Sequence, residues 1–302
     1  MKKNIILYFD APAEVSFSYQ YLKKSIRERQ EELLACFPQE KIDIFMARGI
    51  ASYLWGNFFS PQFQKKWKKW KQQKIEKVEA DLVLGFPIPQ GVTKPFPSLR
   101  DITLDKTHIE ALFPKYTLHS HICEDYHEIQ ASFENISTHL KVLKPLCGTR
   151  GRGIFIGEIL PQKHIFPENY YPYILQEFFD TSSGWQEYLW YHDFRVVILN
   201  GNIIGKFLRQ PKKGSYISNT HRNGRFLDLT SENLPQDVEK IVSHIDSFLA
   251  WKYDIRFYSI DFGRNTLGEL KIFEMNSAPW LSTPFVAHAL GNYIRENILK
   301  IS

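Results

Sequence analysis

One predicted hairpin carries the residues best suited to chemistry. Its two arms, FYSIDF at 257–262 and LKIFEMN at 270–276, alternate apolar and polar residues, which is typical of half-buried strands. Between them Gly263, Asn265 and Gly268 supply the turn chemistry of a hairpin. Pairing the arms would bring Asp261 close to Glu274, with Asn276 on the same side of the sheet as Glu274. Carboxylate and amide oxygens suit Mg²⁺, which proteins usually hold together with nucleotide phosphates. The hairpin therefore predicts a magnesium–nucleotide site, unless its carboxylates are ordinary polar residues.

A glycine-rich stretch at 141–157, KVLKPLCGTRGRGIFIG, is the second candidate. A predicted strand at 140–145 leads into a loop with three glycines and then into a strand at 154–156. Glycines let the backbone approach a polyphosphate and point N–H groups at it, and Lys144 can reach the same phosphates. The loop is not a Walker A loop, because GK[ST] is absent and a strand follows. Phosphate binding is favoured over a plain glycine-rich hairpin.

A second hairpin is predicted from Asp193 to Arg209, turning at Asn200-Gly201. Arg195 and Arg209 are candidates for phosphate clamps, with surface ion pairs as the alternative. The polar, basic segment 211–225 that follows has the length of a loop that closes over an active site. The aromatic segment WQEYLWY at 185–191 either shapes a substrate pocket or packs, and His192 and His221 are either proton carriers or polar loop residues.

The elements that must position these residues form an α/β protein. Near the N-terminus predicted strands alternate with helices, which indicates a small parallel unit without a GxGxxG loop. The strands are 4–9, 42–46 and 81–86, and the helices are 13–37 and a basic one over 63–78. The sequence KKWKKWK at 65–71 could bind nucleic acid or a membrane surface. Its aromatic residues share one helical face, so a solvated amphipathic helix is favoured.

Composition narrows the class of protein. The chain has 302 residues, 43% of them hydrophobic, and a net charge of +5, which nucleotide substrates explain as well as nucleic acid does. No apolar run is long enough for a membrane span, and the short run after Met1 does not make a signal peptide. The three cysteines have no metal-type spacing, which favours free thiols. We expect a cytoplasmic globular protein.

Six motifs in a fixed order resemble the ATP-grasp superfamily, most closely its glutathione-synthetase-like and ribosomal-protein–glutamate-ligase-like branch. They are LKPLCGTRGRGI at 143–154, LQEF at 175–178, HDFRVVILNGNIIGKFLR at 192–209, NTHRNG at 219–224, SIDF at 259–262 and EMNSAP at 274–279. With Lys106 as its start, the resemblance covers about two thirds of the chain. It implies an α/β (α+β grasp) fold, with an N-terminal α/β domain before a two-subdomain ATP-grasp fold. The expected boundaries are 1–100, 101–178 and 179–302.

The resemblance also implies roles for individual residues. Lys106 and Lys144 would contact ATP phosphates, and backbone groups at a hinge would meet the adenine. The hinge residues are Gln176, Glu177 and Phe178, and the loop covering the phosphates contains Gly148, Thr149, Gly151 and Gly153. The ribose contact is unassigned, because the insertion after Asp180 obscures the alignment.

The remaining implied roles concern the reaction itself. Arg209 would stabilise the transferred phosphoryl group, with Arg195 as a further cation, and Asn219 and Arg222 would lie in the closing loop. Two Mg²⁺ ions, or Mn²⁺, would be held by Asp261, Glu274 and Asn276.

The activity implied by the resemblance is that of an ADP-forming carboxylate–amine ligase acting through an acyl-phosphate. Its partners would be ATP, a carboxylate donor and an amine acceptor, with an amino acid, peptide or peptide-like substrate. Two alternatives stay open: an ATP-grasp phosphotransferase, and a nucleotide-binding scaffold with a basic surface for nucleic acid or membrane. Nucleic acid is the less favoured partner, and homo-oligomers are common among grasp ligases.

Overall fold

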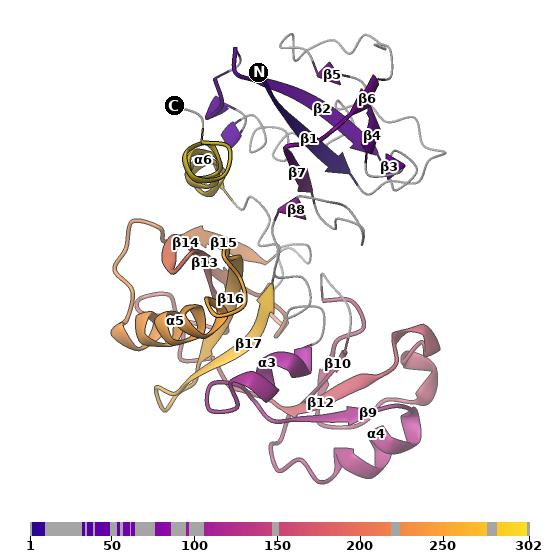
Figure 1. Ribbon diagram of the computed structural model, residues 1–302. Coiled ribbons are helices and arrows are strands. Elements are labelled where there is room, and N and C mark those ends of the chain that lie inside the picture. The colour runs from indigo at the N-terminus through magenta and orange to yellow at the C-terminus, as the bar shows by residue number, and fades with distance from the viewer. Residues whose placement is uncertain are drawn as a thin grey trace. The chain divides into compact units, whose positions relative to one another are not determined.

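The computed structural model divides the chain into two compact units, Met1–Ser98 with Ala278–Ser302, and Leu99–Ser277 (Figure 1). Each unit is described by itself below. The described residues are 2–9, 32–33, 35–38, 40–48, 53–54, 57–60, 62–63, 76–85, 95–96, 106–146, 151–218, 224–276 and 283–300.

The first unit contains a largely parallel sheet in the order β5-β2-β1-β7-β8. Its strands are β1 (Lys3–Phe9), β2 (Ile42–Arg48), β5 (Gln62–Phe63), β7 (Leu82–Gly85) and β8 (Pro95–Phe96). Strand β1 pairs in parallel with β2 and β7, β7 pairs in parallel with β8, and β5 runs antiparallel to β2. Ile5, Ile6 and Val83 are fully buried, because strands covered on both faces need continuous apolar runs. The three predicted strands of this unit and their parallel pairing are confirmed.

A second, three-stranded sheet in this unit corrects one prediction. It consists of β3 (Tyr53–Leu54), β4 (Asn57–Ser60) and β6 (Glu76–Val78), in the order β3-β4-β6. The basic helix predicted over 63–78 is wrong at both ends, because Phe63 lies in β5 and Val78 in β6. Pairing with neighbouring strands outweighs the local helical spacing there. Residues 64–75 and most of the helix predicted over 13–37 lie outside the described residues.

The end of the chain belongs to this first unit as well. Helix α6 (Pro284–Tyr293) begins at Thr283, whose hydroxyl accepts a hydrogen bond from the Val286 N–H, and the π-helical turn η6 (Ile294–Ile298) follows. The Arg295 guanidinium donates to the Cys36 carbonyl at 3.3 Å, and a Cβ atom on Gly291 would lie 2.7 Å from the Leu33 carbonyl oxygen. The prediction of one subdomain over 179–302 is therefore wrong for residues 278–302, because these long-range contacts leave no local sequence signal.

One half of the second unit is a four-stranded antiparallel sheet in the order β11-β10-β12-β9. The strands are β9 (Ser120–Cys123), β10 (Lys141–Pro145), β11 (Phe155–Gly157) and β12 (Tyr173–Glu177), accompanied by α3 (Lys106–Leu112), α4 (Tyr126–Phe133) and the 3₁₀ turns η3 (Lys163–Ile165) and η4 (Glu168–Tyr170). Asp125 caps α4 by accepting from the Glu128 N–H. Buried side chains from α4 and the sheet, including Phe133, Leu143 and Tyr173, form its core.

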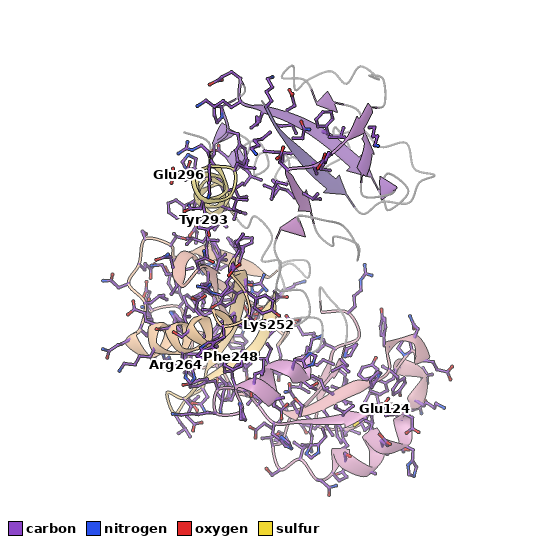
Figure 2. All side chains as sticks on the ribbon, viewed as in Figure 1. Glu124, Phe248, Lys252, Arg264, Tyr293 and Glu296 are labelled. Carbon is purple, nitrogen blue, oxygen red and sulfur yellow. The ribbon has the colours of Figure 1, made fainter. Side chains whose placement is uncertain are left out.

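The other half is a five-stranded antiparallel sheet in the order β15-β14-β13-β16-β17. Its elements are β13 (Asp193–Leu199), β14 (Asn202–Gln210), β15 (Arg225–Asp228), α5 (Gln236–Leu249), β16 (Phe257–Arg264) and β17 (Leu270–Asn276). The apolar side of α5 packs into one core with this sheet, with Val238 and Ile245 fully buried. Arg264, labelled in Figure 2, ends β16. Its guanidinium binds both carboxylate oxygens of Asp237 in the first turn of α5.

The two predicted hairpins of this sheet are confirmed, with one correction. Asn200 and Gly201 both have positive φ, 47° and 79°, as a two-residue turn between twisted strands requires. Gly263 is not a turn residue but lies within β16, where a Cβ atom would fall 2.1 Å from the Phe273 ring. The turn is made instead by Asn265, whose side-chain oxygen accepts from the Leu267 and Glu269 N–H groups, and by Gly268.

The two sheets of the second unit are tied together at β17. The Ile272 N–H donates to the Tyr116 carbonyl at 2.7 Å, and the Lys144 ammonium lies 3.5 Å from the Phe273 carbonyl oxygen. No helix within the described ranges combines the length and the apolar character needed to cross a bilayer.

Candidate active site

The carboxylates of the C-terminal hairpin lie directly opposite each other. In the register of β16 and β17, Asp261 pairs with Glu274 and Ser259 pairs with Asn276. Because side chains alternate along a strand, these four residues share one face of the sheet. The register shifts between Asp261 and Phe262, and the pairing continues from Phe262 with Ile272. The hairpin brings the predicted acids together, and it adds Ser259, which the sequence interpretation missed.

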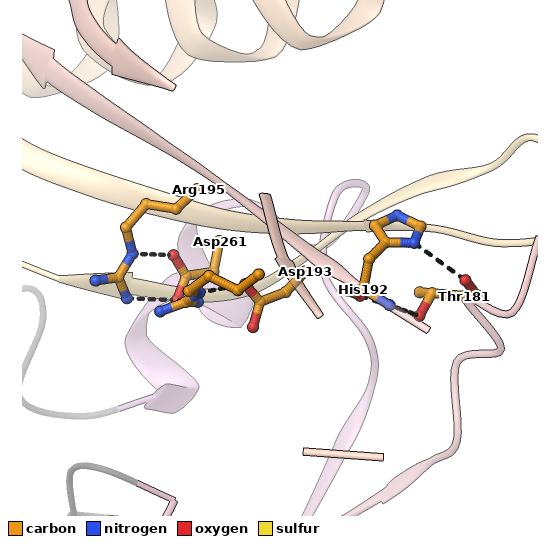
Figure 3. Close-up of polar contacts among 6 residues, drawn as sticks. Thr181, His192, Asp193, Arg195 and Asp261 are labelled. Atoms are coloured by element: carbon orange, nitrogen blue, oxygen red, sulfur yellow. Dashed lines mark hydrogen bonds and ion pairs between the residues drawn. The ribbon is translucent and has the colours of Figure 1, made fainter. Parts of the chain in front are cut away.

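Asp261 is already engaged by two arginines (Figure 3). Arg195 binds it in a two-pronged ion pair, with Nε 2.6 Å from Oδ1 and Nη2 2.7 Å from Oδ2. Arg209 Nη2 lies 2.6 Å from Oδ2, and its Nε also pairs with Asp193. Only 3% of Asp261 is exposed. Arg195 and Arg209 therefore do form ion pairs, but buried ones that position a carboxylate, and not the surface pairs considered above.

The charges of this network set its protonation. Although burial alone would raise the pKa of Asp261, Arg195 and Arg209 lower it to about 2. Burial raises the pKa of Asp193 to about 6 against the opposing pull of Arg209. The pKa of Arg209 is raised by both carboxylates despite burial. At neutral pH two arginines thus balance two aspartates.

A narrow pocket brings the predicted nucleotide-binding lysines to the same hairpin. Its lining includes Lys106 from α3, Lys144 from β10, Gln176 from β12 and Glu274 from β17. Lys106 donates to the carbonyls of Pro145 and Leu146, each at 3.1 Å. The cavity measures about 10 Å³, which is about the space one water needs, so binding a nucleotide requires its walls to separate.

Lys144 is the electrostatically unusual residue of this pocket. Burial lowers the pKa of its ammonium to about 8, although Glu274 and Glu110 oppose the shift, while the positive charge of Lys106 adds to it. The ammonium lies 3.5 Å from the backbone carbonyl oxygen of Phe273. An incoming anion would stabilise the charged form of this lysine and raise its pKa, so the pocket is suited to polyphosphate.

The predicted adenine hinge is only partly available in this structure. The Gln176 side chain donates to the Leu118 carbonyl at 3.3 Å and to Ser120 Oγ at 2.6 Å, which ties β12 to β9. The Phe178 N–H donates to the Leu140 carbonyl at 3.3 Å. Glu177 is exposed. Gln176 therefore has a structural hydrogen-bond role within the sheet.

The phosphate loop is described only in part. Gly151 and Gly153 have positive φ, 69° and 70°, a conformation that glycine adopts without strain. A Cβ atom on Gly153 would lie 2.8 Å from both Pro145 and the Tyr170 ring. Gly148 and Thr149 lie outside the described residues, as do Asn219, Arg222 and His221 of the closing loop.

Three further residues of the site carried little sequence signal. Asp193 is two positions before Arg195, so strand alternation alone could have placed it on the same face. Glu110 lines the pocket and binds His119 and the Ser120 N–H through Oε1, while its buried Oε2 has no partner among the described residues. Ser259 was hidden within an ordinary strand pattern.

His192 is buried, and its sequence interpretation as a proton carrier is not supported. Its N–H and carbonyl both bond to the Thr181 hydroxyl, and its Nδ1 lies 3.0 Å from the Thr181 carbonyl oxygen (Figure 3). Burial lowers the pKa of the imidazole to about 4. Trp185, from the aromatic segment, is also buried and stacks on Phe194 with ring centres 4.2 Å apart.

The oxygen ligands on the hairpin fit a hard divalent cation. Asp261, Glu274 and Asn276 share one face, and the Asn276 amide nitrogen is buried with no partner among the described residues. The amide orientation at such a position is interchangeable, so its oxygen can face the same point. Within the described ranges, no three His, Cys, Asp or Glu side chains are grouped so that they could hold a metal ion. A metal ion at the hairpin would therefore also need the Asn276 amide as a ligand.

Part of the chain is similar in sequence to curated ligases. The probable alpha-L-glutamate ligase of Aeromonas salmonicida is 28% identical over 145 residues, 46% of this chain and 43% of that protein. The chain spans about half the length of the curated relatives it matches.

Solved structures share the fold at low identity. The VanG D-Ala:D-Ser ligase of Enterococcus faecalis has a TM-score of 0.66 at 11% identity, over 100% of this chain and 99% of that one. A RiPP-associated ATP-grasp ligase of Chryseobacterium gregarium, in complex with ADP and a leader and core peptide, has a TM-score of 0.58 at 12% identity, over 100% and 98%. These similarities confirm the mixed α/β, ATP-grasp fold.

The family comparison covers the part of the chain that holds the pocket. The family model for the ATP-grasp domain of prokaryotic glutathione synthetase matches residues 106–274, more than half of the chain. This segment contains Lys106 at one end and Glu274 at the other, with the arginine–aspartate network between them. The chain belongs to the family of prokaryotic glutathione synthetase ATP-grasp domains.

Proposed function

We propose that this protein is an ADP-forming carboxylate–amine ligase that acts through an acyl-phosphate on an amino acid or peptide. The observation that carries the proposal is the convergence of Lys106, Lys144 and Glu274 on one pocket, within the segment that matches the family. A carboxylate and a polyphosphate repel each other, so a site that joins them needs cations near both. The names of the relatives and structural neighbours, which include glutamate and peptide ligases, support the substrate class.

The roles of individual residues form part of the proposal. Lys106 and Lys144 bind the phosphates of ATP under the loop with Gly148, Thr149, Gly151 and Gly153, and the chain around Gln176, Glu177 and Phe178 meets the adenine. Mg²⁺, or Mn²⁺, is held by Asp261, Glu274 and Asn276, where it neutralises charge on the transferring phosphoryl group. Asn219 and Arg222 remain predictions for the closing loop.

The arginines divide into two tasks in this scheme. Arg195 uses its fork to bind both oxygens of Asp261, so it positions that carboxylate and is no longer proposed as a direct phosphate ligand. Arg209 holds Asp261 with one nitrogen and Asp193 with another, which places its charge beside the carboxylates. We assign Arg209 to stabilising charge on the phosphoryl group.

The proposed reaction has two steps. A substrate carboxylate oxygen attacks the γ-phosphorus of ATP, the bond from that phosphorus to the β–γ bridging oxygen breaks, and ADP leaves. The amine nitrogen of the second substrate then attacks the acyl carbon, the carbon–oxygen bond to phosphate breaks, and the amine loses a proton. The acyl-phosphate is sensitive to water, which is why the site must close over it. A cytoplasmic location, where ATP is supplied, completes the proposal.

The test measures ADP release from MgATP with pooled amino acids and small dipeptides. We expect release to require a particular pool and to fall at least about a hundredfold in Glu274→Gln, which removes a proposed metal ligand. Glu239→Gln on α5 is the matched control, because Glu239 is exposed and far along the chain from the pocket residues.

Hydroxylamine then separates the ligase from its alternative. Hydroxylamine captures an acyl-phosphate as a hydroxamate, so hydroxamate in the active pool supports the ligase. A stable phosphorylated product without hydroxamate would instead establish a phosphotransferase. Intact MgATP binding with no stimulated release by any pool, peptide or protein acceptor would contradict both activities.

A further inference from the structure

A second pocket in the same unit lies beside the exposed part of the aromatic segment. It has a volume of about 270 Å³ and is lined by Trp190, Gln210, Pro211, Lys213 and Arg225. Gln210 follows Arg209 in β14, so its side chain points to the opposite face of the sheet from the Arg209–Asp261 ion pair. The proposed ligase site therefore does not account for this pocket.

Fixed backbone and a buried polar side chain build the pocket. Gln210 is 6% exposed, its amide donates to the Leu189 carbonyl at 2.8 Å, and its backbone pairs with Arg225 across β14 and β15. The hydrogen bond to Leu189 holds the chain just before Trp190. Three of the lining residues are thus fixed relative to one another by Gln210.

Trp190 is held in an unfavourable conformation with its ring in solvent. Its φ is 105°, which is rare for a bulky residue and costs about 1–3 kcal/mol, and 44% of the residue is exposed. Its ring contacts Tyr191 edge to face at 5.2 Å, and Tyr191 in turn contacts Phe178, the residue after β12, at 5.9 Å. A run of aromatic rings therefore connects this pocket to the proposed adenine hinge.

The charges in the pocket have one sign. Lys213 and Arg225 are exposed, and within the described residues neither has an ion pair. None of the described residues that line the pocket is acidic. Two cations beside an exposed indole ring and a proline suit a ligand with carboxylates and some apolar surface.

We propose that this pocket binds the carboxylates of an acidic peptide, as a substrate-recognition site separate from the catalytic pocket. The inference rests on the proposed function, because it takes the acidic peptide to be a substrate of the proposed ligase. Because this pocket is separate from the reacting atoms, it would hold a peptide by its acidic residues. The carboxylate that reacts with ATP would then stay free.

Binding of a labelled acidic peptide tests the proposal without any turnover. The probe is fluorescein-labelled tetraglutamate amide, measured by anisotropy at low salt against the intact protein. We expect binding to weaken at least tenfold in Lys213→Glu/Arg225→Glu, with unchanged MgATP affinity. The double variant Lys163→Glu/Lys240→Glu changes two exposed lysines elsewhere in the same unit and the same net charge, so it controls for long-range attraction.

Trp190→Gly provides the second variant, because glycine adopts positive φ without strain. If Trp190 has no binding role, Trp190→Gly should bind the peptide as the wild type does, whereas a binding role predicts weaker peptide binding with unchanged MgATP affinity. Tetraglutamine with a free carboxyl terminus shows whether the chain end is recognised as well as side chains, and either result supports carboxylate recognition.

Three outcomes would overturn the inference. They are no binding to the wild type at millimolar peptide, equal binding to the charge-reversed pocket, or tighter pocket-dependent binding of an oligothymidylate of equal charge, which would indicate a phosphate ligand. Failure of the peptide-binding test would leave ADP release, and its loss in Glu274→Gln, unaffected. Failure of the ADP-release assay with intact peptide binding would contradict only the proposed reaction.

Discussion

The two sheets of the second unit treat charge in opposite ways. On the four-stranded sheet, Lys144 lies in a narrow pocket near one carbonyl, and burial lowers its pKa to about 8. On the five-stranded sheet, Asp261 is buried yet paired with two arginines, so its pKa falls to about 2. Among the described residues the ammonium of Lys144 forms no ion pair, although Glu274 and Glu110 line the same pocket. In the second region, the positive charges of the two arginines balance the negative charges of Asp193 and Asp261.

This difference indicates how a ligand changes each region. An anion entering the first pocket gains a charged lysine without displacing an existing strong ion pair. A cation entering near Asp261 must share that carboxylate with Arg195 and Arg209, which an ionised aspartate permits because it has about four acceptor sites. Binding should therefore change protonation mainly at the first region and hydrogen-bond geometry mainly at the second.

The largest expected effect comes from breaking the self-neutralised region. Asp261→Ala would leave two buried guanidinium groups without their shared partner, so we expect a loss of about 3–5 kcal/mol in the free energy of unfolding. Urea denaturation measures it. Lys2→Ala, which removes the exposed ion pair with Asp43, should lose less than about 1 kcal/mol. Equal losses of unfolding free energy in the two variants would show that the buried network stabilises the protein no more than an exposed ion pair does.

A smaller effect is expected from changing the shape of the first region. Gly153→Ala combines a φ of 70° with a Cβ atom 2.8 Å from Pro145 at the end of β10, so we expect a loss of about 1–3 kcal/mol. In Gly214→Ala the φ is 85° but nothing lies within 4 Å of the added atom. The difference between the two variants in thermal unfolding isolates the steric contribution, and no difference would contradict close packing at Gly153.

The smallest effect is a pH dependence of nucleotide binding. Lys144 is protonated below its pKa of about 8, and bound phosphates should raise that pKa. Lys144 should therefore add no pH dependence to MgATP affinity below pH 8. Above pH 8 the affinity should fall by up to about tenfold per pH unit. Calorimetric titration from pH 7 to 9.5 measures the slope. Lys144→Arg keeps its charge throughout and should remove the slope, whereas a persistent slope would assign it to another group.

Local patterns were sufficient for much of this structure. Alternating residues at 257–262 and 270–276 predicted β16 and β17, and Asn200-Gly201 predicted a turn, because strand periodicity and turn chemistry are local properties. The order of short motifs also predicted the family. Local patterns failed at Phe63 and Val78, where helical spacing is overruled by strand pairing, and at Gly263, where the close approach of Phe273 decides the residue.

The sequence by itself determined the two hairpins of the five-stranded sheet, the ATP-grasp family and the residue types that can bind phosphate and Mg²⁺, since all of these are encoded in short segments. Tertiary structure alone decided that Arg195 and Arg209 converge on Asp261, that burial shifts the pKa of Lys144, and that α6 returns to the first unit. The partners in these contacts are 16 to 259 residues apart, and the shift at Lys144 depends on local exclusion of solvent. Charge pairing and desolvation are properties of the folded surroundings, which no local pattern of residues specifies.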